Sequence, residues 1–390
     1  MKISADKHAT VLVVVGTRPE AIKMSPVVSA LRETKNIRPL LVFTGQHDSL
    51  ISQTMQGMTF DPDISLDLMS PDQNLYELTA KCLLGLREVV QSQKPDCVLV
   101  QGDTTTAFAG SMVAFLEGVP LGHVEAGLRS RNNKEPFPEE GYRKMIDAIT
   151  DFYFAPTSVS AQNLKLEGIP QQNIFITGNT VVDAIHTILP HFSTPQNSKL
   201  ASILASAPSK LVLLTAHRRE SFGQPLQNIF QAVQHLTELD SELEIIYPVH
   251  PNPNVSENLG QLIGNDRIHL LDPLSYEDLL LTLQNVGLVL TDSGGIQEEA
   301  PSFGVHTLIM RNNTERQEGV TVGVATLVGT NSATIVSAAL EKLDSCKSQM
   351  QNPDIPNNPY GDGKASERIA DILESVIIGN PRTTEDWMGP

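Results

Sequence analysis

The stretch VLVVVGTRPEAIKMSPVVSALRE, residues 11–33, decides the fold. Val11 to Val15 form a continuous run of β-branched and leucine side chains, which is typical of a buried strand. A Gly and the sequence Thr-Arg-Pro follow, and then apolar residues recur at helical spacing, namely Ala21, Met24, Val27, Val28 and Leu31. A strand, a tight turn and a helix in this order open a doubly wound α/β unit.

The turn of this unit differs from a dinucleotide-binding fingerprint, because no G-x-G-x-x-G follows the strand. A nicotinamide cofactor is therefore not indicated. Arg18 and Lys23 stand at and just inside the predicted helix N-terminus, where backbone N–H groups and the helix dipole favour an anion. We expect both side chains to face phosphate, with an ordinary surface charge as the alternative reading.

The same strand–turn–helix pattern recurs along the chain. Predicted strands of the first half include Pro39–His47, Cys97–Val100, a run ending at Glu125, and Phe152–Ala155. Further strands are predicted in NIFITGNTVVDAIH, KLVLLTAHRRESFG, LEIIYPVHPNP and RIHLLDPLSYEDLL, at Leu288–Thr291, and in HTLIMRNNTERQEG. We predict an α/β fold of two Rossmann-like doubly wound domains facing a central cleft, at residues 1–190 and 191–375. Residues 376–390 are a tail that is loose or packs Trp387 on the body.

Three carboxylates stand where apolar runs stop between residues 101 and 143: Asp103 in QGDTTT, Glu125 in GHVEAGLRS and Glu139 in PFPEEGYR. Ligands of open parallel sheets bind beyond the carboxyl ends of the strands, so two such acids should point into one crevice. Taken singly, each acid could be a helix cap or a loop acid. The site interpretation gains support from charged neighbours, namely Glu140, Arg129, Arg131 and Arg143.

The second half predicts a diphosphate site. The run Leu288–Thr291 ends in Asp-Ser-Gly-Gly, and the Gly pair allows a phosphate to approach the N–H groups of the helix predicted from Ile296 onward. Ser293 adds a hydroxyl, and Glu299 one turn later suits a ribose diol. Cations near predicted strand ends also suit a small multiply charged anion. They are Arg18, Lys23, His217, Arg218, Arg219, Arg311 and Arg316.

The composition limits the function classes. The 390 residues carry a net charge of −17, which argues against nucleic acid or an anionic membrane as a partner. Cys82, Cys97 and Cys346 form no CxxC and no disulfide framework, so a reducing cytoplasm is expected. We expect no signal peptide and no membrane-spanning run, and neither H-E-x-x-H nor G-x-S-x-G occurs. No metal is expected, and His250 and His269 are expected to be structural.

Twelve ordered motifs from residue 11 to about 375 resemble the non-hydrolysing UDP-N-acetylglucosamine 2-epimerases. They are GTRPEAIKMSPVV, TGQH, GDTTT, GHVEAGLRS, FPEE, TGNTVVDA, LTAHRRE, YPVHPNP, TDSGGIQEEAPS, TER, LVGT and NPYGDGKAS. The resemblance implies a glycosyltransferase-B type fold, a homodimer, no cofactor and a role in cell-surface polysaccharide biosynthesis. It also implies interconversion of UDP-GlcNAc and UDP-ManNAc by elimination of UDP to a glycal and readdition.

The resemblance also implies roles for individual residues. The family's catalytic carboxylates and histidine match Asp103, Glu125, Glu139 and His217. Its nucleotide-binding positions match Arg18, Lys23, Ser293, Gly294, Gly295, Glu299 and Arg316, with Arg143 as a support. Leu274 would offer main-chain contacts to the base, and Leu279 stands where Phe commonly backs the uracil, so stacking is lost there.

Two departures bear on substrate and regulation. Tyr142 stands where many members have Asn before the Arg of PEExxR, so contacts to the sugar are expected to differ. Gln46 and His250 match an activator site for a second UDP-GlcNAc, but Ser49 and Asp72 replace a common Gln and Arg. An Asp facing a diphosphate is repulsive by on the order of 1 kcal/mol, which disfavours dependence on an activator.

Other functions stay open at this point. They are a hydrolysing 2-epimerase that releases ManNAc and UDP, and a 2-epimerase of a modified UDP-hexosamine such as a 2,3-diacetamido uronic acid. A glycosyltransferase of the same fold and a non-catalytic nucleotide-sugar binding protein are the remaining alternatives.

Overall fold

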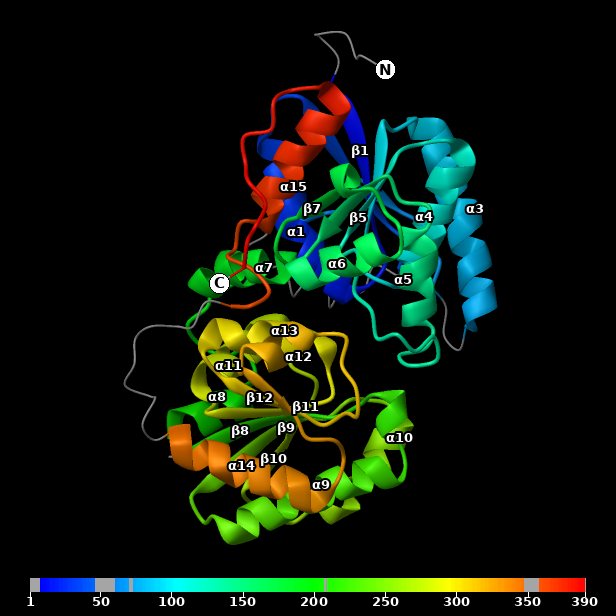
Figure 1. Ribbon diagram of the computed structural model, residues 1–390. Helices are drawn as coiled ribbons and strands as arrows, with labels where there is room; N and C mark the ends of the chain where they lie inside the picture. Colours follow the sequence, from blue (N-terminus) through cyan, green and yellow to red (C-terminus); the bar gives the residue numbers. More distant parts are fainter. Residues whose placement is uncertain are drawn as a thin grey trace. The chain divides into compact units, whose positions relative to one another are not determined.

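The computed structural model describes residues 8–45, 60–69, 73–206, 208, 210–346 and 358–389. The chain forms two compact units, one built from Met1–Thr187 with Tyr360–Pro390 and the other from Ile188–Pro359. Both are α/β units with a parallel sheet (Figure 1). Two doubly wound parallel sheets confirm the predicted fold class.

The first unit contains a seven-stranded sheet in the order β3-β2-β1-β4-β5-β6-β7. Its elements are β1 (Ala9–Val15), α1 (Arg18–Glu33), β2 (Ile37–Phe43), β3 (Ile64–Ser65), α3 (Leu75–Gln93), β4 (Cys97–Gln101), α4 (Thr105–Glu117), β5 (Leu121–Val124), α5 (Glu139–Asp147), β6 (Phe152–Ala155), α6 (Ser158–Leu166), β7 (Ile174–Ile176), α7 (Thr180–Ile188) and α15 (Ala365–Leu373). The strand order reverses between β1 and β4, which is where doubly wound sheets bind ligands.

Alternate residues of β1 enter two separate cores. Val11, Val13 and Val15 pack with α1 and α15 on one face of the sheet. Leu12 and Val14 pack with α3 and α4 on the other face. Both faces of β1 are therefore covered, which explains why its sequence is continuously apolar.

The second unit repeats this architecture with a six-stranded sheet in the order β10-β9-β8-β11-β12-β13. Its elements are α8 (Ser198–Ser206), β8 (Lys210–Thr215), α9 (Gln224–Leu239), β9 (Leu243–Pro248), α10 (Pro253–Ser256), β10 (Ile268–Leu271), α11 (Tyr276–Asn285), β11 (Leu288–Thr291), α12 (Gly294–Glu299), β12 (His306–Ile309), α13 (Gln317–Thr321), β13 (Ala325–Leu327) and α14 (Ser332–Cys346). The order reverses between β8 and β11, and α9 and α14 pack against the sheet.

The carboxyl end of the chain differs from the expected domain boundaries. Residues 360–375 were expected in the second domain, but they belong to the first unit. The reason is the apolar face of α15, which packs beside α1 (red and blue in Figure 1). Trp387 of the tail is also bound to the first unit, because its backbone N–H donates to the carbonyl of Ile176 in β7 at 2.8 Å.

Candidate functional site

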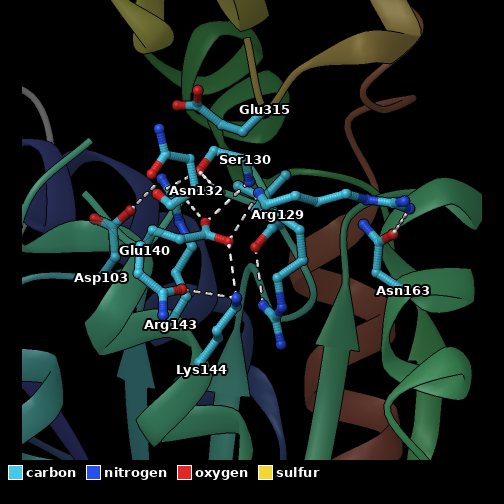
Figure 2. Close-up of polar contacts among 12 residues, drawn as sticks. Asp103, Arg129, Ser130, Asn132, Glu140, Arg143, Lys144, Asn163 and Glu315 are labelled. Carbon is cyan, nitrogen blue, oxygen red and sulfur yellow. Dashed lines mark hydrogen bonds and ion pairs between the residues drawn. The ribbon is translucent and has the colours of Figure 1, made fainter. Parts of the chain in front are cut away.

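Asp103 stands immediately beyond β4 and faces α5. Its Oδ2 lies 2.6 Å from Nη2 of Arg143, and Nη1 of Arg143 lies 3.1 Å from Oε2 of Glu140. Figure 2 shows these three side chains gathered in one group. Arg143 is almost fully buried whereas Asp103 keeps 24% of its side chain exposed. The geometry therefore fixes one oxygen of Asp103, and part of its side chain remains accessible to solvent.

Glu125 follows β5 and is held by two donors on one oxygen. Its Oε2 lies 2.5 Å from Nζ of Lys23 and accepts a hydrogen bond from Nε2 of Gln101 at 2.7 Å. Lys23 belongs to α1, the helix after β1, and Gln101 is the last residue of β4. These contacts therefore join the segments that follow β1, β4 and β5. The expected strand end at Glu125 is one residue late, because β5 stops at Val124 and Glu125 adopts φ +69°.

Glu139 and Glu140 begin α5 but have different environments. Glu140 is completely buried and accepts the backbone N–H groups of Ser130 and Arg131, at 2.9 and 3.1 Å. It therefore fixes the loop after the GHVEAGLRS motif. Glu139 is half-buried, and its Oε2 has no hydrogen-bond partner among the residues that the structure describes. Of these two acids, Glu139 is thus the one whose oxygen is available to react.

The turn between β1 and α1 is fixed by Glu20. Its Oε2 accepts the N–H groups of Gly16 and Thr17, and its Oε1 accepts the hydroxyl of Thr104 at 2.6 Å. Burial raises the pKa of Glu20 to about 7, although these donors oppose the shift. Arg18, the first residue of α1, is half-buried beside this turn. The Glu20–Thr104 bond ties the Arg18 turn to the Asp103 turn.

His217 occupies the corresponding reversal point of the second unit, directly beyond β8. Its backbone N–H donates to Oδ2 of Asp292 at 2.9 Å, and its imidazole ring stacks on the ring of His250 with centroids 5.0 Å apart. Burial lowers the pKa of His217 below its ordinary value, and the nearby carboxylate of Asp292 only partly opposes this shift. A neutral imidazole at a strand end can donate one N–H to an anion.

The helix α12 begins at Gly294, so the Gly pair forms its N-terminus as expected. A Cβ at Gly294 would lie 2.5 Å from Nη1 of Arg316, so the close approach of this guanidinium requires glycine. Arg316 also contacts two buried acids, Glu298 at 2.7 Å and Glu315. Glu299 is buried at the end of α12. Arg316 therefore packs over the turn with its charge balanced by carboxylates.

The other residues that the sequence analysis singled out lie in different environments. Leu274 and Leu279 are half-buried before and within α11. Tyr142 stacks on Phe108 with ring centroids 5.0 Å apart, so its ring is used in packing within the first unit. His250 is exposed, and its Nδ1 accepts the N–H of Asn252 at 3.2 Å. Positions 46, 49 and 72 of the activator prediction lie outside the described residues.

Several residues hold these turns in place, and sequence reasoning did not assign this structural role to any of them. They are Glu20, Gln101, His123, Glu140, Asp147 and Asp292. Five of them adjoin a quoted motif or lie within it, so their position was a usable signal. Their partners are distant in sequence, however, and the local pattern does not specify such pairings.

Within the described residues, no group of three or more His, Cys, Asp or Glu side chains is arranged to hold a metal ion. No helix there has both the length and the apolar character that crossing a membrane requires.

Comparison with known proteins gives consistent matches over nearly the whole chain. A family model described as UDP-N-acetylglucosamine 2-epimerase matches residues 29–374. A UDP-N-acetylglucosamine 2-epimerase of Salmonella typhimurium is 42% identical and covers 94% of this chain and 99% of its own length. The S. aureus MnaA–UDP co-structure is 40% identical, with a TM-score of 0.88 and coverage of 98% and 100%. The Neisseria meningitidis UDP-GlcNAc 2-epimerase bound to UDP-GlcNAc is 37% identical, with a TM-score of 0.85 and coverage of 93% and 99%.

Proposed function

This chain belongs to the UDP-N-acetylglucosamine 2-epimerase family, and from that premise we propose that it interconverts UDP-GlcNAc and UDP-ManNAc without hydrolysing them. No carbonyl adjoins C2 of this sugar to acidify its proton, so inversion requires either a redox cofactor or elimination across C1 and C2. The turn after β1 lacks the dinucleotide fingerprint, which favours elimination.

In the proposed elimination a carboxylate takes the C2 proton while the C1–O bond breaks. The bonding electrons leave with UDP, and the sugar becomes a glycal. In the return step, C2 gains a proton on the opposite face and an oxygen of UDP bonds to C1 again. Atoms and electrons balance in both directions, so the reaction needs no external oxidant or reductant.

We assign the proton transfers to the acids of the first unit. Asp103 and Glu139 are the best candidates to exchange the C2 proton, because one keeps an exposed carboxylate and the other has a buried oxygen without a hydrogen-bond partner among the described residues. Glu125 completes the catalytic set; its bond to Lys23 orients that ammonium. Arg18 and Lys23 lie at the helix end where an anion is favoured, so we assign them to the phosphates.

We assign the nucleotide to the second unit. The turn Ser293–Gly295 would receive the diphosphate, Glu299 the ribose, and the α11 region around Leu274 and Leu279 the base. Arg316 over the same turn would then exchange part of its contact with acids for a phosphate. His217, neutral because its pKa is lowered, would donate a hydrogen bond to the departing UDP.

The observation that carries this proposal is the pair of acids beyond β4 and β5, each held by a cation next to the reversal of the first sheet. Incubation of UDP-GlcNAc with the protein in heavy water tests it. We expect UDP-ManNAc and UDP-GlcNAc that both gain deuterium at C2. Product without label at C2 would contradict elimination, and free ManNAc with UDP would indicate a hydrolysing enzyme.

The same assay addresses the remaining alternatives. Turnover with no acceptor present would exclude a glycosyltransferase, and turnover of any kind would exclude a binding protein. The ring of Tyr142 stacks on Phe108, so it is used for packing within the first unit, which supports UDP-GlcNAc over a modified sugar. A panel of UDP-hexosamines would show this preference directly.

We also propose a homodimer. Adjacent helices of the first unit expose large apolar side chains, and Glu117 at the end of α4 contacts Gln91 of α3 at 3.1 Å. These side chains are Leu75, Tyr76, Leu84, Phe115 and Leu116. Exposed apolar side chains on two neighbouring helices suit a self-complementary contact between two copies.

A further inference from the structure

We propose that the buried pair His123 and Asp147 positions the carboxylate-bearing segments of the first unit for epimerisation. The inference rests on the proposed function and concerns residues that touch no substrate. His123 on β5 is 0% exposed, and Asp147 at the end of α5 is 1% exposed. Neither side chain can reach a bound sugar, so any effect on turnover must pass through their neighbours.

His123 holds the turn that carries Asp103. Its Nε2 lies 2.8 Å from the carbonyl oxygen of Gly102, the residue directly before Asp103. Gly102 adopts φ +72°, and its N–H donates to the carbonyl of Val124 at 3.0 Å. Both peptide groups of Gly102 are thus tied to β5, one of them by the His123 ring. The direction in which the chain leaves β4 toward Asp103 is set by these two contacts.

Asp147 holds the loop that follows Glu125. Its Oδ1 lies 2.7 Å from Nδ1 of His123, and its Oδ2 accepts the N–H of Gly127 at 3.2 Å and Nη2 of Arg129 at 2.7 Å. Because Asp147 ends α5, the helix that begins at Glu139, this carboxylate connects that helix to the Glu125 loop. The pair therefore joins the segments of all three proposed catalytic acids.

The hydrogen-bond pattern orients the His123 ring and favours an ionised Asp147. A carbonyl oxygen can only accept, so Nε2 of His123 carries a proton toward Gly102. Oδ2 of Asp147 also accepts from Gly127 and Arg129, and the guanidinium of Arg129 favours the carboxylate form. Burial alone would raise the pKa of Asp147, but His123 and Arg129 more than offset this and lower it. Asp147 is thus favoured as a carboxylate, which binds His123, Gly127 and Arg129 at the same time.

Asp147→Asn and His123→Asn test this inference in the full-length protein. Asp147→Asn keeps the shape of the side chain but removes its negative charge and one of the two acceptor oxygens that face His123, Gly127 and Arg129. We expect kcat to fall by roughly 100-fold or more, as for small displacements of catalytic groups, with KM changed by less than about threefold. UDP affinity, measured by calorimetry, should change by less than about threefold, because the base, the ribose and the Ser293–Gly295 turn contacts are all assigned to the second unit.

The matched control is His269→Gln, which removes another histidine–carboxylate pair, that between His269 and Glu244 at 2.6 Å on β10 and β9. Its kcat should equal that of the wild type. A purely structural role of His123 and Asp147 would lower the melting temperature while leaving kcat per folded molecule within about twofold, and this result would overturn the inference. If His123→Asn does not fold, Asp147→Asn decides. A wild type without turnover would instead refute the proposed function itself.

Discussion

At the scale of single residues, a carboxylate next to an arginine has two possible uses, as a structural anchor or as a reactive group. Glu140 and Asp103 both contact Arg143, but only Asp103 remains partly exposed. Glu140 uses its oxygens for two backbone N–H groups, which identifies it as the anchor. The sequence placed both acids near the site, because each follows a recognisable motif, but it did not separate these roles. Burial and hydrogen-bond partners separate them.

Asp103→Asn tests the reactive role. An Asn keeps the shape of the side chain and an acceptor for Arg143 but cannot take a proton. We expect kcat to fall roughly 1000-fold, within the range of general acid–base catalysis, while UDP affinity stays nearly unchanged. Steady-state kinetics and calorimetry give the two values. Glu117→Gln, at the exposed end of α4, is the matched control and should keep wild-type kcat. Full activity of Asp103→Asn would remove Asp103 from the mechanism.

Glu20 gives a pH prediction at the same scale. Its pKa is raised to about 7 in the folded protein from 4.5, so the neutral acid is favoured by folding. The stabilisation is fully present below about pH 4.5 and is lost as pH rises through about 7. Urea unfolding between pH 5 and 8 should show the wild type losing up to about 3 kcal/mol relative to Glu20→Gln, which carries no charge. Parallel profiles of the two proteins would contradict this assignment.

At the scale of elements, the sequence predicted most strands of both sheets because their apolar runs are bounded by turn residues. Phe152–Ala155 and Leu288–Thr291 match β6 and β11 residue for residue. The prediction Pro39–His47 differs from β2, Ile37–Phe43, because an apolar run does not show where pairing with β1 begins. The amphipathic helix from Ala365 was also located, but its apolar face did not reveal which core it covers.

Ile372→Ala tests the assignment of α15 to the first unit. Ile372 is fully buried in the core that contains Val11 and α1, so the substitution should destabilise that unit by about 2–5 kcal/mol. Denaturant unfolding should show an earlier transition for the first unit and an unchanged one for the second. Val376→Ala is the comparison. Val376 is 37% exposed and lies outside this core cluster, so its substitution should have a smaller effect. If Ile372→Ala destabilised the second unit instead, the assignment of α15 to the first unit would be wrong.

At the scale of the whole molecule, the two sheets repeat one design. Each reverses its strand order once, and each carries its candidate residues directly beyond the strands at that reversal: Asp103 after β4, and His217 after β8. This repetition could be predicted from the sequence, because polar residues follow the predicted strands directly in both halves. It did not reveal the buried anchors, since the bond between His217 and Asp292 spans 75 residues and that between Lys23 and Glu125 spans 102.

The proposed homodimer is a property of this scale, and the exposed apolar side chains of α3 and α4 make it testable. Leu116 is 70% exposed at the end of α4, and a glutamate there would put two like charges into an interface related by two-fold symmetry. Light scattering should give about twice 42.5 kDa for the wild type and a single chain for Leu116→Glu. Leu239→Glu controls for added charge, because Leu239 ends α9 of the second unit with 65% exposure. A dimeric Leu116→Glu, or a monomeric wild type, would mean that this surface does not join two copies.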